Sequence, residues 1–200
     1  MIIAFIGFDG TGKTTTALEL VKQLKKRGKK ILYWEEFEYL LLKYILKLFK
    51  KQVKKHRNDF FDVKKKKIHV MYIIWQYFIL IDSLLTYIYH RALSLFGYAV
   101  VCDRYHYDYI IPGEELRYIA PFLKKLFLLL PRPDVGIMMD IPADTAFERK
   151  KLIDPYPQSW FRNRRKMYIE LNKKIKFTVV NSTNTLSKNI NSILRIIDSK

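Results

Sequence analysis

The sequence predicts an α/β fold in which a five-stranded parallel sheet carries helices on both faces. Short apolar runs alternate along the chain with longer segments of helical periodicity. The apolar runs are continuous, which is typical of strands buried on both faces, and their alternation with helices indicates βαβ units. Half of the 200 residues are hydrophobic and 28% are charged, a composition that excludes disorder. Without an internal repeat or a Gly/Ser linker, we expect one domain over residues 1–200.

Five apolar runs are the strand candidates. In chain order they are Ile2–Ile6, Ile31–Trp34, Tyr98–Cys102, Asp134–Ile141 and Phe177–Val180. The first helix is expected over Thr14–Arg27, because Gly28 then takes the position of a helix-ending glycine. A helix over Asn189–Ile197 is expected to close the chain.

Two other segments have strong helical character. Val70–Tyr89 is apolar for twenty residues, long enough for a membrane span, but Asp82 near its centre favours a core helix that is hydrophobic on most sides. Tyr39–Lys55 has an apolar side and a lysine-rich side. A solvated surface helix is favoured there. The alternative is that the basic stretch over residues 43–67 contacts nucleic acid or an anionic membrane.

The charge balance is strongly basic, with 37 Lys and Arg against 19 Asp and Glu and a net charge of +18. Such a field attracts phosphate-bearing ligands, nucleic acid or anionic membranes, and a lysine-rich compositional bias accounts for it equally well. Cys102 is the single cysteine, so no intrachain disulfide forms and no zinc cluster of cysteines exists. The N-terminal run lacks the basic region of a signal peptide, and we expect a cytoplasmic protein.

One motif carries recognisable chemistry. Gly7-Phe8-Asp9-Gly10-Thr11-Gly12-Lys13-Thr14 matches the phosphate-binding pattern G-x-x-x-x-G-K-[ST], followed by Thr15. A buried strand precedes it and an amphipathic helix follows it, which is the context of a P-loop and predicts a P-loop NTPase fold. Glycines let backbone N–H groups approach phosphate oxygens, Lys13 adds a positive charge, and the Thr14 hydroxyl suits Mg²⁺. Residues 7–15 are thus the expected ATP site.

Carboxylates and an arginine complete the predicted centre. Asp9 lies inside the loop, where a kinase can use it to hold an acceptor hydroxyl. Asp103 ends a buried strand, the usual place of the Mg²⁺-side carboxylate, and Arg104 beside it has the planar fork that grips a phosphate.

A basic, proline-interrupted stretch over residues 149–165 is the predicted lid. The P-loop carries no arginine, so an arginine that neutralises transition-state charge has to come from elsewhere. Arg149 and Arg165 are favoured over Arg162 and Arg164.

These motifs, in this order, resemble the thymidylate kinase family over nearly the whole chain. The P-loop resembles the family signature, Cys102-Asp103-Arg104-Tyr105 resembles its Asp-Arg-Tyr motif, and Arg165 three residues before Tyr168 resembles its lid exit. The resemblance implies ATP- and Mg²⁺-dependent transfer to a nucleoside monophosphate, with dTMP first among acceptors, and a homodimer. Asp9 then holds a sugar hydroxyl, Arg104 the acceptor phosphate, and Asp103 helps to organise Mg²⁺.

The acceptor half departs from the family pattern. Asp82-Ser83 stands where the family often carries Asp-Arg or Asn-Arg, and His106-Tyr107-Asp108 replaces the expected serine after the Asp-Arg-Tyr motif. We expect Tyr105, Asp82 and Asp108 to contact the acceptor. Two alternatives remain: a kinase with another nucleotide, a nucleoside or a sugar phosphate as acceptor, and a nucleotide-dependent module that binds nucleic acid or membrane.

Overall fold

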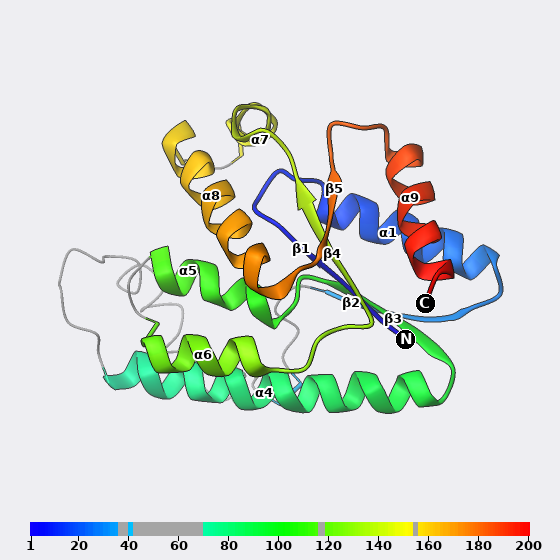
Figure 1. Cartoon of the computed structure of the whole chain (residues 1–200), viewed down its shortest axis with the longest axis horizontal. Coiled ribbons are helices and arrows are strands. Elements are labelled where there is room, and N and C mark those ends of the chain that lie inside the picture. The colour runs from blue at the N-terminus through cyan, green and yellow to red at the C-terminus, as the bar shows by residue number, and fades with distance from the viewer. Residues whose placement is uncertain (36–39, 42–69, 116–118, 154–155) are drawn as a thin grey trace.

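A computed structural model arranges the chain around one parallel sheet (Figure 1). It describes residues 1–35, 40–41, 70–115, 119–153 and 156–200. The strands are β1 (Ile2–Ile6), β2 (Lys30–Trp34), β3 (Tyr98–Asp103), β4 (Val135–Asp140) and β5 (Thr178–Asn181). Their order is β2-β3-β1-β4-β5, and every pairing is parallel. The predicted fold class is confirmed, and the predicted strands lie within one residue of the observed bounds.

The helices that the structure describes fill the connections between strands. They are α1 (Lys13–Lys26), α4 (Val70–Leu95), α5 (Ile110–Glu115), α6 (Pro121–Leu129), α7 (Ala143–Lys150), α8 (Gln158–Ile175) and α9 (Leu186–Asp198), with a 3₁₀ turn η1 (His106–Tyr109). Gly28 follows α1 with a φ of 76°, and its N–H donates to the Lys25 carbonyl at 2.9 Å. This is the helix ending that the sequence predicts.

Two hydrophobic layers enclose the sheet, one on each face. On one face, Ile3 and Phe5 of β1 pack with the apolar sides of α1 and α9. On the other face, Ile2, Ala4 and Ile6 pack with residues of α4, α5, α6 and α8. Figure 1 shows α1 and α9 together on one side of the strands, with α4, α6 and α8 on the other. The central strand β1 is therefore fully buried, as its uninterrupted apolar run predicts.

The topology determines where a ligand can bind. The chain leaves β1 toward β2 on one side of the sheet and later crosses to β4 on the other. The carboxyl ends of β1 and β3 meet at this reversal, with Phe5 paired to Asp103. Open α/β sheets bind ligands in the crevice that forms at such a point. The P-loop follows β1, and Arg104 follows β3, so the fold brings both predicted phosphate-binding elements there.

Helix α4 packs on the core, as the sequence analysis expects, but it is not buried on all sides. Ile79 lies in the core, and part-buried Trp75, Leu80, Tyr87 and Leu93 pack against it. Its buried positions also include the polar residues Gln76, Asp82 and His90, while Ile81 and Ile88 are each 54% exposed. The inner face of the helix therefore carries both apolar and polar side chains. In the part of the chain that the structure describes, no helix is long and apolar enough to cross a membrane.

The predicted amphipathic helix over Tyr39–Lys55 lies almost wholly outside the described residues, as does the basic stretch over 43–67. The predicted lid, residues 149–165, spans the end of α7 and the first turns of α8, with residues 154–155 outside the described part.

Candidate active site

The P-loop is built by glycines whose backbone other residues rarely adopt. Gly7, Gly10 and Gly12 have φ values of 145°, 85° and 80°. A Cβ on Gly7 would lie 2.6 Å from the Met139 carbonyl oxygen, and one on Gly10 would lie 3.0 Å from the Ala146 carbonyl oxygen. The loop is thus compressed between β4 and α7, where only glycine fits. Its backbone leads directly into the first turn of α1, the positive end of that helix.

Lys13 begins α1 and is folded back into the loop. Its side chain is only 6% exposed, and its ammonium donates to the Phe8 carbonyl at 2.9 Å. Burial, aided by the nearby Arg104, lowers the pKa of Lys13 to about 8. The Thr11 hydroxyl donates to the same Phe8 carbonyl at 2.8 Å, so this carbonyl organises the interior of the loop. The hydroxyl-bearing Thr14 and Thr15 lie exposed on the first turn.

Asp103 and Arg104 terminate β3 beside the loop. The Tyr33 hydroxyl donates to Asp103 Oδ2 at 3.1 Å. Among the described residues, Asp103 Oδ1 is buried and has no hydrogen-bond partner. Arg104 has a φ of 85°, a strained conformation for a side-chain-bearing residue. The bend turns its guanidinium toward the P-loop.

The guanidinium of Arg104 is surrounded by acidic and phenolic groups. Its Nη2 donates to Asp9 Oδ1 at 2.6 Å, and its Nη1 lies 3.4 Å from the Tyr168 hydroxyl and 3.7 Å from Asp108 Oδ1. The Tyr168 hydroxyl donates to Asp108 Oδ1 at 2.5 Å. One arginine thus links the P-loop, η1 and α8.

Burial affects the two carboxylates of this cluster differently. Burial by itself would raise the pKa of Asp9, but the charges of Arg104 and Lys13 outweigh it and hold that pKa below its usual range. Burial raises the pKa of Asp108 despite the opposing effect of Arg104. Both Asp108 oxygens are engaged, since Oδ2 accepts from the Tyr105 backbone N–H at 3.0 Å. Of these two carboxylates, Asp9 is the one that belongs to the P-loop.

A pocket opens next to Arg104. It is lined by Trp34, Glu35, Asp82, Ser83, Thr86, Tyr87, His90, Cys102, Arg104, Tyr105, His106, Asp108 and Tyr109. Predicted acceptor residues Tyr105, Asp82 and Asp108 therefore share one pocket with Arg104. Asp82 also holds the chain in front of α4, because its two oxygens accept the backbone N–H groups of Leu40 and Leu41 at 2.9 and 2.7 Å.

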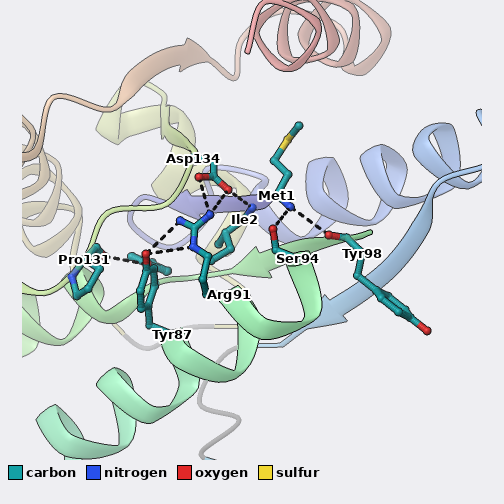
Figure 2. Close-up of polar contacts among 9 residues, drawn as sticks. Met1, Ile2, Tyr87, Arg91, Ser94, Tyr98, Pro131 and Asp134 are labelled. Carbon is teal, nitrogen blue, oxygen red and sulfur yellow. Dashed lines mark hydrogen bonds and ion pairs between the residues drawn. The ribbon is translucent and has the colours of Figure 1, made fainter. Parts of the chain in front are cut away.

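Hydrogen bonds made by Arg91 fix the position of α4, which forms one wall of the pocket. Figure 2 shows Arg91 reaching between Tyr87 and Asp134. Its Nε and Nη2 donate to the Tyr87 hydroxyl at 3.2 and 3.1 Å, and its Nη1 donates to Asp134 at 3.0 Å. Asp134 also accepts the Ile2 backbone N–H at 2.6 Å. These bonds tie the helix to the amino ends of β1 and β4, which sets its rotation relative to the sheet.

The basic side chains of the lid do not face the same way. Arg149 donates to the Gly10 and Ser182 carbonyls at 3.2 and 3.4 Å, so it braces the P-loop backbone. Arg165 makes two hydrogen bonds to Asp140, at 2.9 and 2.8 Å. Arg162 pairs with exposed Asp144. Within the part of the chain that the structure describes, none of these three arginines donates a hydrogen bond to Asp9.

Arg164 lies on the inner side of α8, one turn before Tyr168. Its side chain is 14% exposed, pairs with Glu115 at 2.7 Å, and lies 4.5 Å from the Trp160 ring. Burial raises the pKa of Asp9, and the charge of Arg164 adds a smaller lowering effect to those of Arg104 and Lys13. The sequence analysis ranked it below Arg149 and Arg165. Its spacing of four residues from Tyr168 is the signal that would have indicated a shared helix face.

His90 and Tyr168 were also not singled out as site residues. His90 lies four and eight residues after Thr86 and Asp82, which is one face of a helix. This polar periodicity is hard to see in the sequence because apolar residues lie on both faces of the helix.

The fold and the glycine-rich loop define a P-loop protein in which Arg104 faces the loop. The sequence profile of the family described as Thymidylate kinase matches residues 5–193, and the chain belongs to this family. It is a nucleoside monophosphate kinase, and the family's reaction is ATP-dependent phosphoryl transfer.

Similar proteins agree in length as well as in pattern. A probable thymidylate kinase of Archaeoglobus fulgidus is 26% identical over all of this chain and 95% of that protein. Another, of Sulfurisphaera tokodaii, is 24% identical over 98% of this chain and 95% of its own length. Among solved structures, a deoxyadenosine kinase from M. mycoides with dCMP and dCDP superposes with a TM-score of 0.61 over the full length of both chains, at 18% identity.

Proposed function

We propose that this kinase transfers the γ-phosphoryl group of ATP to the 5′-phosphate of dTMP. The observation that carries the proposal is Arg104, which contacts Asp9 of the P-loop at 2.6 Å while lining the pocket beside it. An arginine in this position can hold an acceptor phosphate next to the donor. The descriptions of the full-length relatives as probable thymidylate kinases support dTMP as the acceptor.

On the donor side, residues 7–15 bind the ATP phosphates. Backbone N–H groups of the glycine-rich loop and of the first turn of α1 hold the phosphate oxygens. Lys13 exchanges its bond to the Phe8 carbonyl for the β- and γ-phosphates, whose negative charge keeps the buried ammonium protonated. Arg149 maintains the loop through the Gly10 carbonyl.

The residues present fit a magnesium ion at the triphosphate. Buried Asp103 Oδ1 has no hydrogen-bond partner among the described residues, and the Thr14 hydroxyl lies on the first turn of α1. Carboxylate and hydroxyl oxygens are the ligands that Mg²⁺ prefers. Asp103 and Thr14 would hold the ion, which neutralises phosphate charge when bound. Tyr33 keeps the carboxylate oriented through its other oxygen.

On the acceptor side, Arg104 binds the phosphate and Asp9 holds a sugar hydroxyl. Asp108 and Tyr168 position the guanidinium, since together they contact its Nη1 side. Tyr105 and Asp82 shape the pocket, Asp82 through the backbone of Leu40 and Leu41.

The lid supplies the remaining positive charge. We assign this role to Arg164, because its charge reaches Asp9 from the inner face of α8. Arg165, paired with Asp140, supports the end of β4 from the neighbouring face. The proposed kinase is therefore one domain over the whole chain, with a lid at about residues 149–165. Chemistry proceeds by positioning and charge neutralisation, without a covalent intermediate.

The proposal is tested with purified protein in two steps. Calorimetry with ATP and Mg²⁺ should show saturable binding, and labelled ATP with a panel of acceptors should show the highest kcat/KM for dTMP. The panel includes other nucleoside monophosphates, deoxynucleosides and a sugar phosphate, which are the alternative acceptors. No heat of ATP binding, or faster transfer to another acceptor, would overturn the corresponding half of the proposal.

A second copy of the chain is the proposed protein partner. Large apolar side chains on the outer face of α4 are exposed, among them Ile74, Phe78, Ile81 and Ile88, at spacings that form one stripe along the helix. An exposed apolar stripe of this kind is typical of a helix-packing interface. The family resemblance also implies a homodimer.

A further inference from the structure

Two buried histidines line the pocket beside Arg104, one from each of two elements. His90 on α4 is 2% exposed, and His106 on η1 is 6% exposed. Among the described residues, Nε2 of each imidazole is buried without a hydrogen-bond partner. Leaving a buried polar atom unpaired destabilises the folded protein. Two such atoms at the same pocket indicate that something else supplies their partner.

Packing holds each ring so that its Nε2 has no hydrogen-bond partner among the described residues. His90 Nδ1 lies 3.7 Å from Cys102 Sγ, and the imidazole packs edge-to-face with the Trp34 ring, with the two ring centroids 4.8 Å apart. His106 is packed between Tyr105 and Tyr107, at centroid distances of 4.1 and 4.3 Å. Neither ring can rotate without disrupting these contacts, so both histidines are preorganised.

Helix α4, which carries His90, is held in place by hydrogen bonds before and after this residue. Arg91, the next residue, is joined to Tyr87 and Asp134 (Figure 2). Eight residues earlier, Asp82 binds the backbone of residues 40 and 41. Position 90 therefore cannot shift along or around the helix axis without breaking charge-assisted hydrogen bonds.

Both histidines present an uncharged hydrogen-bonding surface. Burial lowers the pKa of His90 to about 4 and that of His106 to about 3, so both are neutral at physiological pH. A neutral imidazole offers one N–H and one lone pair. Arg104 is the single Lys or Arg among the pocket-lining residues. The pocket thus combines Arg104 and three carboxylates, Glu35, Asp82 and Asp108, with neutral imidazole and aromatic side chains.

We propose that His90 and His106 hydrogen-bond the nucleobase of the acceptor and select it. The assignment rests on the proposed function, since the phosphate on Arg104 directs the base toward the imidazoles. The histidines take over a task for which no arginine follows Asp82, since Ser83 stands at that position. They read a neutral base edge that carries an N–H donor or a carbonyl acceptor, such as the N3 and O4 edge of thymine.

The test compares His90→Phe and His106→Phe with His90→Gln in the full chain. Phenylalanine keeps the ring and removes both nitrogens, and glutamine returns a polar atom near the position of Nε2. We expect each Phe variant to raise KM for dTMP about three- to tenfold, the value of one hydrogen bond, with KM for ATP unchanged. His90→Gln should recover most of the loss. A KM for dTMP within twofold of wild type in both Phe variants would overturn the proposal.

A second readout separates recognition from a structural role. Removing an unpaired buried nitrogen should leave the melting temperature of the ligand-free Phe variants equal to or above that of wild type. The increase in melting temperature caused by dTMP should shrink in the same variants. A lower melting temperature without ligand, with an unchanged increase on adding dTMP, would assign the histidines a structural role only.

A methylated acceptor locates the contact on the base. N3-methyl-dTMP lacks the N–H donor at the base edge, so wild type should bind it more weakly than dTMP. A Phe variant that has already lost this contact should bind N3-methyl-dTMP and dTMP with nearly equal affinity. Equal losses in wild type and in both variants would contradict a bond to N3. If wild type phosphorylates no nucleoside monophosphate but dTMP still raises its melting temperature in a histidine-dependent way, the proposed function fails and the binding inference stands.

Discussion

Arg104 has the least ordinary backbone among the described site residues. Its φ of 85° places it in a left-handed conformation that costs an arginine about 1–3 kcal/mol. Its N–H still donates to the Phe5 carbonyl at 3.1 Å, so β3 stays paired with β1 up to the bend. The strain is maintained because the bend directs the guanidinium to Asp9, Asp108 and Tyr168. Such local strain is common at functional sites, where a side chain has to be held in one particular direction.

Gly10 is the residue at which the P-loop is most easily tested. Gly10→Ala adds a Cβ 3.0 Å from the Ala146 carbonyl at a φ of 85°, and we expect ATP affinity to fall at least tenfold because the loop must open. Calorimetry measures the affinity. Gly97→Ala is the matched control, since its φ is 82° and nothing lies within 4 Å of the added Cβ. That control should lose about 1 kcal/mol of stability and keep ATP binding. Equal ATP affinities in the two variants would contradict the close-packing argument.

Lys13 should make stability depend on pH in a defined direction. Its folded pKa is about 8 against an ordinary 10.5, so below pH 8 both folded and unfolded chains hold the proton and the cost of the buried charge is fully present. Above pH 8 the folded chain releases its proton first and gains stability until about pH 10.5. Without nucleotide, Lys13→Met should therefore be more stable than wild type at pH 7 by about 1–3 kcal/mol.

Urea unfolding at pH 7 and pH 10 measures this difference, which should shrink at the higher pH. Lys22→Met, at an exposed lysine on the same helix, is the control and should show no such change. The same Lys13→Met protein should have almost no kinase activity. A variant that is less stable than wild type at pH 7, or a difference that grows toward pH 10, would contradict the burial argument.

At the scale of the element, α8 separates its arginines by face. Arg164 is partly buried beside Glu115 and Trp160, whereas Arg162 is 61% exposed and pairs with equally exposed Asp144. Inner-face charge reaches the site through low-dielectric surroundings, while exposed pairs contribute little. The spacing of residues along the helix thus decides which arginine can serve the reaction.

Replacing Arg164 should slow phosphoryl transfer strongly. Arg164→Lys keeps a positive charge for Glu115 but loses the planar fork, and we expect kcat to fall at least about 100-fold while KM for ATP changes little. Arg162→Lys is the matched change on the outer face and should leave kcat unchanged. Steady-state kinetics with saturating acceptor give both values. Similar kcat values for the two variants would place the catalytic arginine elsewhere in the lid, with Arg149 and Arg165 the next to test.

Helix α4 has two faces with opposite tasks. Its inner face carries polar side chains to the pocket, and Arg91 and Asp82 fix its position. Its outer face carries the apolar stripe of Ile74, Phe78, Ile81 and Ile88. The sequence predicts a core helix because apolar residues outnumber polar ones, and it does not show that apolar residues occupy both faces, with Ile79 in the core and the stripe exposed.

At the scale of the whole molecule, the apolar stripe predicts self-association. Ile81→Glu together with Ile88→Glu should convert a dimer into a monomer, because two charges would be buried on each side of the interface. Light scattering after size-exclusion chromatography measures the mass. Leu152→Glu, at a 94% exposed position away from α4, is the control and should leave the mass unchanged. A wild-type chain that is monomeric at tens of micromolar would contradict the proposed partner.

The order of elements and the phosphate loop could be predicted because both are local in sequence. An apolar run of five residues before Gly7 predicts a buried strand, and the glycine and lysine spacing after it predicts the loop. Asp103 and Arg104 could be placed at a carboxyl strand end for the same reason. The family follows from these motifs in their order, and the profile match over residues 5–193 confirms it.

The acceptor half could not be predicted in this way because its residues come from separate elements. His90 and His106 meet in one pocket only when α4 and η1 pack on the same face of the sheet. Arg164 and Glu115 are 49 positions apart, and no local pattern indicates their pairing. The direction of α4 depends on hydrogen bonds to Asp134 and to residues 40 and 41, which periodicity does not contain.

The amino-acid sequence alone therefore determined the α/β architecture, the glycine-rich loop after β1 and the membership of a kinase family, since backbone propensity and glycine spacing act over a few neighbouring residues. Tertiary structure decided which arginine of the lid lies on the inner face of α8, which side of α4 lines the pocket, and which buried histidines lie beside Arg104 in it. Those choices depend on packing and on charge-assisted bonds between distant segments, which come into existence only when the chain has folded.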